Sequence, residues 1–402
     1  MIWTERKRGK KMKKFLQGIK VIGFETAGAG PTASKLLAEY GAEVIMIEPL
    51  NGINTRISRS FDFYFLHKKS IAVNMKTPEG MEIVHRLLRD ADVFVSNYRK
   101  KVIDKFGLDY ESLHEKYPRL IHATLTGYGE HGPMKDAPGF DTTAYWGRAG
   151  LAKTVREKDG DPIVTPSSIG DIGTGTMLCG GILGALYHRE RTGEAMKVYI
   201  SLYGAGVWQN DEQMIFSQLG YPYPQSRLTP RRAYANTYLL KDGYFHFHTL
   251  DPNRDMPRIM EIIGREDVIA DPEYNQHWAD DGVKAIQLRK IMDAGFEQMT
   301  VAEAKDAFAE KDIAFGEICG PEDVLKDPQA EANQLLFKHK MLEGEELYLA
   351  SSPIKYMDDI PCEDGPAPKC GEHTVEILEE CGYSETEIKE LKQKNVVHAE
   401  NK

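Results

Sequence analysis

The chain has 402 residues, which is enough to bury a sizeable core and to form two domains. Its 61 acidic and 51 basic residues give a net charge of -10, which argues against a nucleic-acid partner because phosphate binding is driven by a basic surface. Five scattered cysteines without a C-x-x-C pair indicate neither a disulfide framework nor a zinc site and fit a reducing cytoplasm, and the lack of a long apolar run predicts that nothing spans a membrane.

The first residues of the chain are unusually basic. Seven lysines and arginines stand between positions 6 and 14, and residues 15–20 lack the apolar core that a signal peptide requires. A basic tail can bind anionic lipid or nucleic acid. The simpler interpretation, which we adopt, is a disordered leader over residues 1–14, with Met12 as an alternative start.

Residues 15–220 have the pattern of an α/β domain. Residues 28–40 have helical spacing, and Thr77, followed by proline and glutamate, marks a second helix start. Strands and helices that alternate in this way form a mostly parallel sheet. Apolar runs typical of its buried strands occur at 19–24, 43–48, 93–95 and 120–123.

The sequence pattern changes in the second half of the chain. Tyrosine-proline pairs over 221–224 mark a linker, and two strand-like runs around residues 241–243 predict a hairpin. We therefore predict a smaller α+β domain over 221–335. Helical patterns return over 336–402, including a capping box that begins at Ser384.

Asp171 is the strongest candidate for a catalytic residue. It stands in the run Ser168-Ile169-Gly170-Asp171-Ile172-Gly173, where apolar residues begin to recur at helical spacing. At a helix N-terminus, free N–H groups and the helix dipole favour an ionised carboxylate. The flanking glycines leave room for a large ligand, although the local sequence also allows a simple helix cap.

Two further segments complete a pattern with Gly170-Asp171. Gly127-Tyr128-Gly129-Glu130-His131-Gly132-Pro133 and Ala137-Pro138-Gly139-Phe140-Asp141 precede it, and in order and spacing the set resembles the class III CoA-transferases, the family of formyl-CoA and carnitine CoA-transferases. Within that family, three runs resemble the transferases of anaerobic amino-acid fermentation that act on 2-hydroxyisocaproate or phenyllactate. These runs are 97–99, 107–113 and 374–383.

The resemblance implies an architecture. A Rossmann-like large domain is built from the N- and C-terminal parts of the chain, with the smaller α+β domain between them. Two such chains interlock as a homodimer, and the enzyme is cytoplasmic.

The resemblance also implies a reaction and its residues. Coenzyme A, as co-substrate, moves from an acyl-CoA to a small carboxylic acid through an aspartyl-CoA thioester, without a metal ion. Asp171, Asp141 and Gly170 are the expected catalytic residues, with backbone N–H groups near Ile172 and Gly173 as donors to the oxyanion. The expected coenzyme A contacts are Ala27, Gly28, Arg56, Lys68, Lys69, Asn97, Lys105 and Phe106.

Three alternatives remain open at this point. A racemase of 2-methylacyl-CoA would share the fold but carries a histidine where this chain has Phe140. A nicotinamide-dependent dehydrogenase fits the loose pattern from Gly28 to Glu48, although Pro31 removes a phosphate-binding N–H. A catalytically silent CoA-binding subunit is the third alternative.

Gly28 bears on the substrate. Formyl-transferring members of the family carry a glutamine there, near the acyl group, and an arginine in place of Lys105. The loss of the glutamine predicts a larger branched or aromatic acyl group.

Overall fold

The computed structural model describes residues 15–221, 223–280, 282–356 and 366–399, so the predicted leader over 1–14 lies outside them. The chain divides into two compact units. The larger unit consists of Met1–Leu151, Val164–Glu212 and Pro328–Lys402, and the smaller one of Ala152–Ile163 and Gln213–Asp327.

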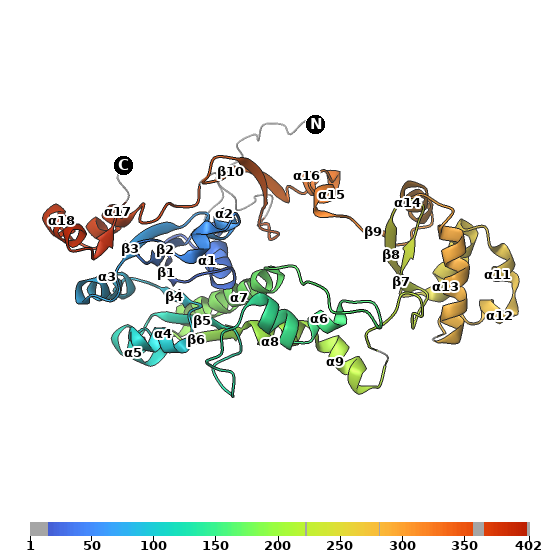
Figure 1. Ribbon diagram of the computed structural model, residues 1–402, viewed down its shortest axis with the longest axis horizontal. Helices are drawn as coiled ribbons and strands as arrows, with labels where there is room; N and C mark the ends of the chain where they lie inside the picture. Colours follow the sequence, from blue (N-terminus) through green and yellow to red (C-terminus); the bar gives the residue numbers. More distant parts are fainter. Residues whose placement is uncertain (1–14, 222, 281, 357–365, 400–402) are drawn as a thin grey trace. The chain divides into compact units, whose positions relative to one another are not determined.

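The larger unit is built on a seven-stranded sheet with the order β12-β3-β2-β1-β4-β5-β6 (Figure 1). Six strands are parallel, and β12 pairs antiparallel with β3 at one edge. The predicted mostly parallel α/β architecture is therefore confirmed. The strands are β1 (Lys20–Phe24), β2 (Glu43–Glu48), β3 (Lys69–Val73), β4 (Val93–Ser96), β5 (Ile121–Thr126), β6 (Lys197–Ser201) and β12 (Val397–His398).

Helices cover this sheet. The predicted helix start at Thr77 is confirmed, because its side chain accepts a hydrogen bond from the Gly80 N–H at 3.1 Å and Pro78 occupies the first turn. The helices of this part are α1 (Ala29–Glu39), α2 (Phe61–Phe65), α3 (Pro78–Arg89), α4 (Lys100–Lys105), α5 (Tyr110–Lys116), α7 (Ile169–Thr192) and α8 (Leu202–Gln209), with a 3-10 turn η1 (Asn54–Ile57) and a π-helix η2 (Asp141–Arg148).

Helix α7 is the central helix of the larger unit. It packs against α1, β5 and β6. Among the described residues, one helix, α7, is long and apolar enough to cross a membrane, judged by length and composition alone. Its contacts with the sheet and with α1 are those of a core helix.

The C-terminal segment returns to the same sheet. The core cluster around Ile22 and Val84 also contains Ile377 and Leu391, so both ends of the chain share one apolar core. The predicted capping box at Ser384 is confirmed. The elements of this return are α16 (Pro328–Ala332), the hairpin strands β10 (Leu336–Lys340) and β11 (Glu346–Ala350), α17 (Thr374–Glu380) and α18 (Glu385–Gln393).

The smaller unit has a three-stranded antiparallel sheet and an aromatic core. The predicted hairpin is confirmed, and Phe245, Phe296 and Phe308 are fully buried beside it. Its elements are β7 (Ala235–Leu239), β8 (Tyr244–His248), β9 (Gly316–Glu317), α10 (Pro252–Ile262), α11 (Glu266–Ala270), α12 (Pro272–Asn275), α13 (Val283–Phe296), α14 (Val301–Glu310) and α15 (Pro321–Val324), while α9 (Asp211–Gln218) and α6 (Leu151–Thr154) span its borders.

The borders of the units differ from the predicted ones at 221 and 335. Residues 152–163, which the sequence pattern assigns to the large domain, group with the smaller unit. The reason is visible in their contacts, since the Glu157 carboxylate accepts a hydrogen bond from the Arg227 N–H at 3.2 Å. Such a contact between distant segments leaves no pattern in the local sequence.

Lys68 is the centre of a buried polar network in the larger unit. Its Nζ donates to Glu25 Oε1 at 2.8 Å, to the Pro31 carbonyl at 3.0 Å and to Ser34 Oγ at 2.7 Å. The side chains of Lys68 and Glu25 are both fully buried. All three N–H groups of the ammonium are used, so the network ties the end of β1 to the first turn of α1.

Lys68→Met is expected to lower the free energy of unfolding by about 3–5 kcal/mol, because it leaves the Glu25 carboxylate buried without its cation. Urea denaturation checks this. Lys100 is a matched control, since its ion pair with Asp104 is exposed and Lys100→Met should change stability by about 0.5 kcal/mol or less. Equal effects of the two substitutions would show that the buried network is not stabilising.

Candidate active site

Helix α7 begins at Ile169, directly after a residue with an unusual backbone conformation. Ser168 has a φ of +74°, in the left-handed region that residues other than glycine rarely adopt. Ala27, before the start of α1, has a φ of +58°. Such conformations concentrate at functional sites, where the surrounding structure maintains them.

The Asp171 carboxylate packs against the backbone of Gly28. A Cβ atom at Gly28 would lie 2.6 Å from Asp171 Oδ2, closer than real Cβ contacts. One turn further along α7, a Cβ atom at Gly175 would lie 2.4 Å from the Ala29 carbonyl oxygen and 2.6 Å from Thr32 Cβ. The two glycines therefore let α1 and α7 approach closely, with the carboxylate at the beginning of α1.

Asp141 lies beside Gly170, the residue before Asp171. A Cβ atom at Gly170 would lie 2.2 Å from Asp141 Oδ1 and 2.3 Å from Tyr145 Cγ. Asp141 is 5% exposed, and its two oxygens form no hydrogen bond within the described residues. The structure thus brings the three predicted catalytic residues together.

Burial controls the charge of this pair of carboxyl groups. Burial, and after it the charge of Asp141, raise the pKa of Asp171 to about 7. Burial also raises the pKa of Asp141, while the N–H groups of Ser168, Gly170 and Asp171 act in the opposite direction. These N–H groups lie near the carboxylate without the geometry of a full hydrogen bond, so they stabilise its charge only partly.

Tyr64, which no motif in the sequence points to, also lies at this site. It lies on α2 and is 4% exposed. Burial raises the pKa of its phenol, the Ser168 hydroxyl lowers it, and the charges of Asp171 and Asp141 raise it, so the phenol lies near all three groups. A tyrosine within an aromatic run looks like a core residue in the sequence, which is why no local signal distinguishes it.

Asn97 and Ala27 hold the loop between β1 and α1. Asn97 accepts a hydrogen bond from the Thr26 N–H at 2.9 Å and donates to the Thr26 carbonyl at 2.6 Å. The Ala27 N–H donates to Thr55 Oγ1 at 2.9 Å. Both predicted coenzyme A contacts therefore lie at the loop that contains Gly28, and each already has a structural partner.

Three predicted cationic contacts for coenzyme A are bonded to carboxylates of the protein itself. Lys68 has no N–H left for a phosphate, and we withdraw it from the proposed contacts. Arg56 and Lys69 bridge segments of the larger unit and are partly exposed. The carboxylate partners are Glu25 for Lys68, Glu48 for Arg56, and Glu43, Glu376 and Glu380 for Lys69.

Lys105 and Phe106 lie at the end of α4. Lys105 is exposed, and within the described part of the chain it forms no ion pair. The Phe106 ring lies edge-on to Phe24 with the ring centres 6.1 Å apart. Lys105 is therefore the predicted cation that remains accessible to a phosphate.

The residues for the alternative chemistries are unsuited to them. Phe140 is 65% exposed and has no group that can transfer a proton. Glu48, which a dinucleotide site would use to bind a ribose, is 1% exposed and accepts hydrogen bonds from Arg56 and Ser70. No cluster of three or more metal-ligating side chains occurs in the described ranges.

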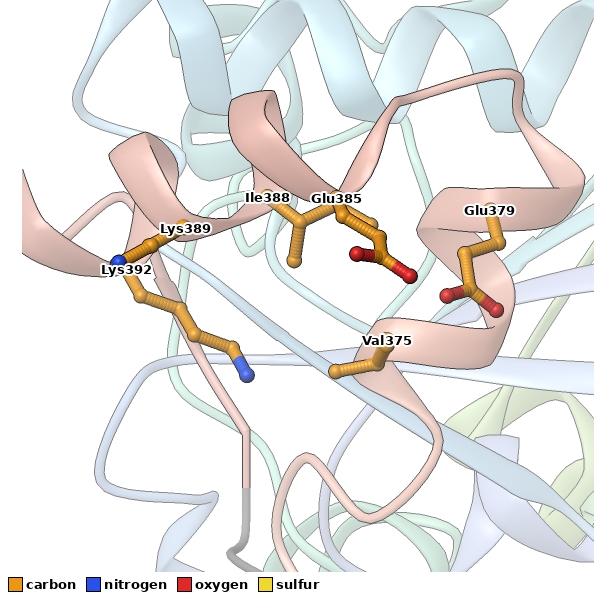
Figure 2. A pocket seen from close by; sticks show the side chains of 6 residues that line it. All are labelled: Val375, Glu379, Glu385, Ile388, Lys389 and Lys392. Carbon is orange, nitrogen blue, oxygen red and sulfur yellow. The ribbon is translucent and has the colours of Figure 1, made fainter.

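A separate hollow of about 280 Å³ lies between α17 and α18 (Figure 2). It shares no residue with the site around Asp171 and carries charged groups of both signs, so we assign it no function. Its lining residues are Val375, Glu379, Glu385, Ile388, Lys389 and Lys392.

Comparison with known proteins identifies the family. The sequence profile of CoA-transferase family III matches residues 16–374. The chain is 35% identical over 397 residues to the (R)-2-hydroxy-4-methylpentanoate CoA-transferase of Clostridioides difficile, covering 95% of this chain and 99% of the relative. The chain therefore belongs to CoA-transferase family III and is a CoA-transferase with coenzyme A as its co-substrate.

Two further similarities support this assignment. The cinnamoyl-CoA:phenyllactate CoA-transferase of Clostridium sporogenes is 36% identical over 394 residues, which are 93% of this chain and 95% of the relative. The crystal structure of a CAIB/BAIF family protein from Brucella suis matches with a TM-score of 0.77 at 27% identity, over 91% of this chain and 99% of that chain. The resemblance found in the sequence is confirmed.

Proposed function

We propose that this enzyme transfers coenzyme A between carboxylic acids through a covalent intermediate on Asp171. The observation that carries the proposal is the position of its carboxylate, which is at the start of α7, against the backbone of Gly28 and beside Asp141. A desolvated carboxylate at a helix N-terminus can act as a nucleophile when a thioester carbonyl lies next to it. A racemase on this fold would also need a histidine where this chain has Phe140, and a dehydrogenase would need Glu48 free to bind a ribose, whereas Glu48 is buried and bonded to Arg56.

The proposed reaction proceeds by paired acyl transfers. An Asp171 oxygen attacks the thioester carbonyl carbon of the acyl-CoA, the C–S bond breaks, and a mixed anhydride and the CoA thiolate form. The thiolate attacks the aspartyl carbonyl carbon and expels the first acid as its carboxylate, which leaves the aspartyl-CoA thioester. The carboxylate of the second acid then repeats these two steps in reverse order, which releases the new acyl-CoA and restores Asp171.

For the oxyanion we propose other donors than the N–H groups near Ile172 and Gly173. The Ile172 N–H donates to the Ser168 carbonyl at 2.9 Å as part of α7, so it is not available. We propose instead the first-turn N–H groups of α1, those of Ala29 and Gly30, which adjoin the Asp171 carboxylate at Gly28. One such donor is typically worth about 3 kcal/mol in the transition state.

Trapping of the intermediate tests the mechanism. Enzyme incubated with acyl-CoA and then treated with hydroxylamine or borohydride should be modified at Asp171 alone, as read by peptide mass spectrometry. Asp141→Asn is the control, because it preserves the nucleophile. Transfer without any modification of Asp171 would overturn the covalent mechanism.

The reaction should depend on pH through Asp171. Only the ionised carboxylate is a nucleophile, and the pKa of Asp171 is raised to about 7, so kcat/KM for the acyl-CoA should fall tenfold per pH unit below about pH 7. Asp141→Asn removes a negative charge that raises this pKa and should move the acidic limb to lower pH. A pH–rate profile that is flat between about pH 5 and 9 would contradict this assignment.

We further propose that the substrates are branched or aromatic acids, with 2-hydroxy acids as acceptors. Two observations support this: the relatives named above act on (R)-2-hydroxy-4-methylpentanoate and phenyllactate, and Gly28 leaves no amide to hold a very small acid. Each CH₂ buried in an apolar pocket contributes about 0.8 kcal/mol, so such a pocket should disfavour formate by orders of magnitude.

A panel of donors and acceptors checks the substrate class. We expect kcat/KM for 2-hydroxyisocaproate and phenyllactate to exceed that for formate and oxalate by at least about 100-fold. Equal or higher values for formate or oxalate would refute the substrate class while leaving the role of Asp171 untouched.

We also propose a cytoplasmic homodimer. Large apolar side chains on the larger unit are strongly exposed in the single chain, including Ile57 at 90%, Val164 at 98% and Trp208 at 76%. A second copy of the chain would cover such surface, as the family resemblance implies. Light scattering coupled to gel filtration measures the oligomeric state directly.

A further inference from the structure

The hairpin of β10 and β11 contacts helix α2 through side chains of both. The five-residue turn between the two strands carries Glu343 and Glu345, whose carboxylates form ion pairs with Arg59, just before α2. These three side chains are largely exposed, so their ion pairs contribute little to stability. A second contact between the hairpin and α2 is buried and is made by Asp62 and His339.

Asp62 on α2 and His339 on β10 form a buried hydrogen-bonded pair. His339 Nε2 donates to Asp62 Oδ1 at 3.3 Å, and the Leu342 N–H donates to the same oxygen at 2.9 Å. Asp62 is 5% exposed and His339 is 8% exposed. A buried carboxylate that accepts two hydrogen bonds from one hairpin fixes that hairpin to the helix.

Asp62 and Tyr64 project from roughly opposite sides of α2. Residues two apart on a helix are separated by about 200° around its axis. The hairpin therefore contacts one side of α2, and the buried Tyr64 phenol lies on the other side, near the Ser168 hydroxyl and within reach of the Asp171 charge. Phe61 and Phe65, whose stacked rings lie 4.5 Å apart, anchor the helix on the sheet. A helix of five residues has little rigidity of its own, so its orientation depends on these contacts.

We propose that Asp62 and His339 are positioning residues, which hold α2 so that the Tyr64 hydroxyl keeps its buried place near Ser168 and Asp171 during transfer. The predicted effect of this pair on the transfer rate rests on the proposed function. Its predicted effect on the position of the Tyr64 side chain does not depend on that function. In this arrangement the C-terminal hairpin acts on the active site through one short helix, without touching substrate.

Kinetics of matched variants test the proposal. His339→Ala should lower kcat at least tenfold with KM for the acyl-CoA changed less than threefold, His339→Gln should restore kcat to within threefold of the parent because it keeps a donor, and Glu345→Gln on the same hairpin should change kcat less than twofold. In a Tyr64→Phe background, His339→Ala should have no further effect. An additive loss in the double variant, or an unchanged kcat in folded His339→Ala, would overturn the proposal.

A second measurement does not depend on activity. The Tyr64 phenol can be titrated by its ultraviolet difference spectrum, assigned with Tyr64→Phe. His339→Ala should shift its titration to lower pH, since the phenol would leave its buried place near the two carboxylates, and Glu345→Gln should not. An unshifted titration in His339→Ala would show that the pair does not position Tyr64. If the parent enzyme shows no trapped intermediate, the proposed function fails, and this titration still decides the positioning role.

Discussion

Asp171→Ala is expected to lower the rate of CoA transfer by about 10³-fold or more, because it removes the atom to which the coenzyme is attached in the proposed intermediate. The affinity for acyl-CoA should change little, since the carboxylate attacks the carbonyl rather than holding the nucleotide. Steady-state kinetics and calorimetric binding of CoA measure the two effects separately. Transfer within tenfold of the parent would rule out Asp171 as the nucleophile.

The stability of the Asp171→Ala variant provides the control for folding. Folding raises the pKa of Asp171, so the folded chain binds a proton that the unfolded chain releases. Ionisation of Asp171 therefore lowers the free energy of unfolding. This loss of stability grows as the pH rises from the ordinary carboxyl pKa to the raised pKa of the folded chain, and it is complete above that pKa. At pH 8 the variant should therefore be at least as stable as the parent, and a strongly destabilised variant would not be informative about catalysis.

Gly170→Ala is expected to reduce transfer by about 100-fold, because the new Cβ would overlap with Asp141 Oδ1 and the Tyr145 ring. One of these side chains must move, and displacement of a well-packed group by a methyl costs about 1–3 kcal/mol of stability. Kinetics and thermal unfolding of the purified variant measure both effects. A variant with unchanged kcat would show that the packing around Asp141 is irrelevant to the reaction.

Gly184→Ala is a matched control on the same helix. A Cβ atom at Gly184 would meet no atom within 4 Å, so the substitution only replaces a flexible residue by a good helix former. It should stabilise the protein by about 0.5–1 kcal/mol and leave transfer unchanged. A comparable loss of activity in both variants would point to a general effect of alanine on α7.

Four of the parallel strands, β1, β2, β4 and β5, could be predicted because they are short apolar runs separated by segments with helical spacing. The position of Asp171 near a helix start could also be predicted, because apolar residues begin to recur at helical spacing just after the glycines around it. The place of Asp141 beside it depends instead on a contact between residues about thirty positions apart, which only the family resemblance implied.

The cations predicted to contact coenzyme A show which contacts cannot be predicted from the sequence. Lys68 and Lys69 are adjacent, and in the sequence they look like an exposed basic pair. Lys68 directly precedes β3 and Lys69 is its first residue. Successive side chains of an extended chain point to opposite sides, so Lys68 is buried against Glu25 while Lys69 stays partly exposed beside Glu43. The strand order decides which carboxylate lies opposite each lysine, and the strand order cannot be predicted from the local sequence.

Strand β12 has a consequence for the synthesis of the chain. Its residues, Val397 and His398, pair with β3, whose residues were made more than three hundred positions earlier. A ribosome that has completed Glu212 has produced all six parallel strands but neither the strand that covers β3 nor the helices of the C-terminal return. Until β12 and these helices have been made, the nascent sheet therefore has an unpaired edge and exposed apolar surface, and at that stage it depends most on protection against association with other chains.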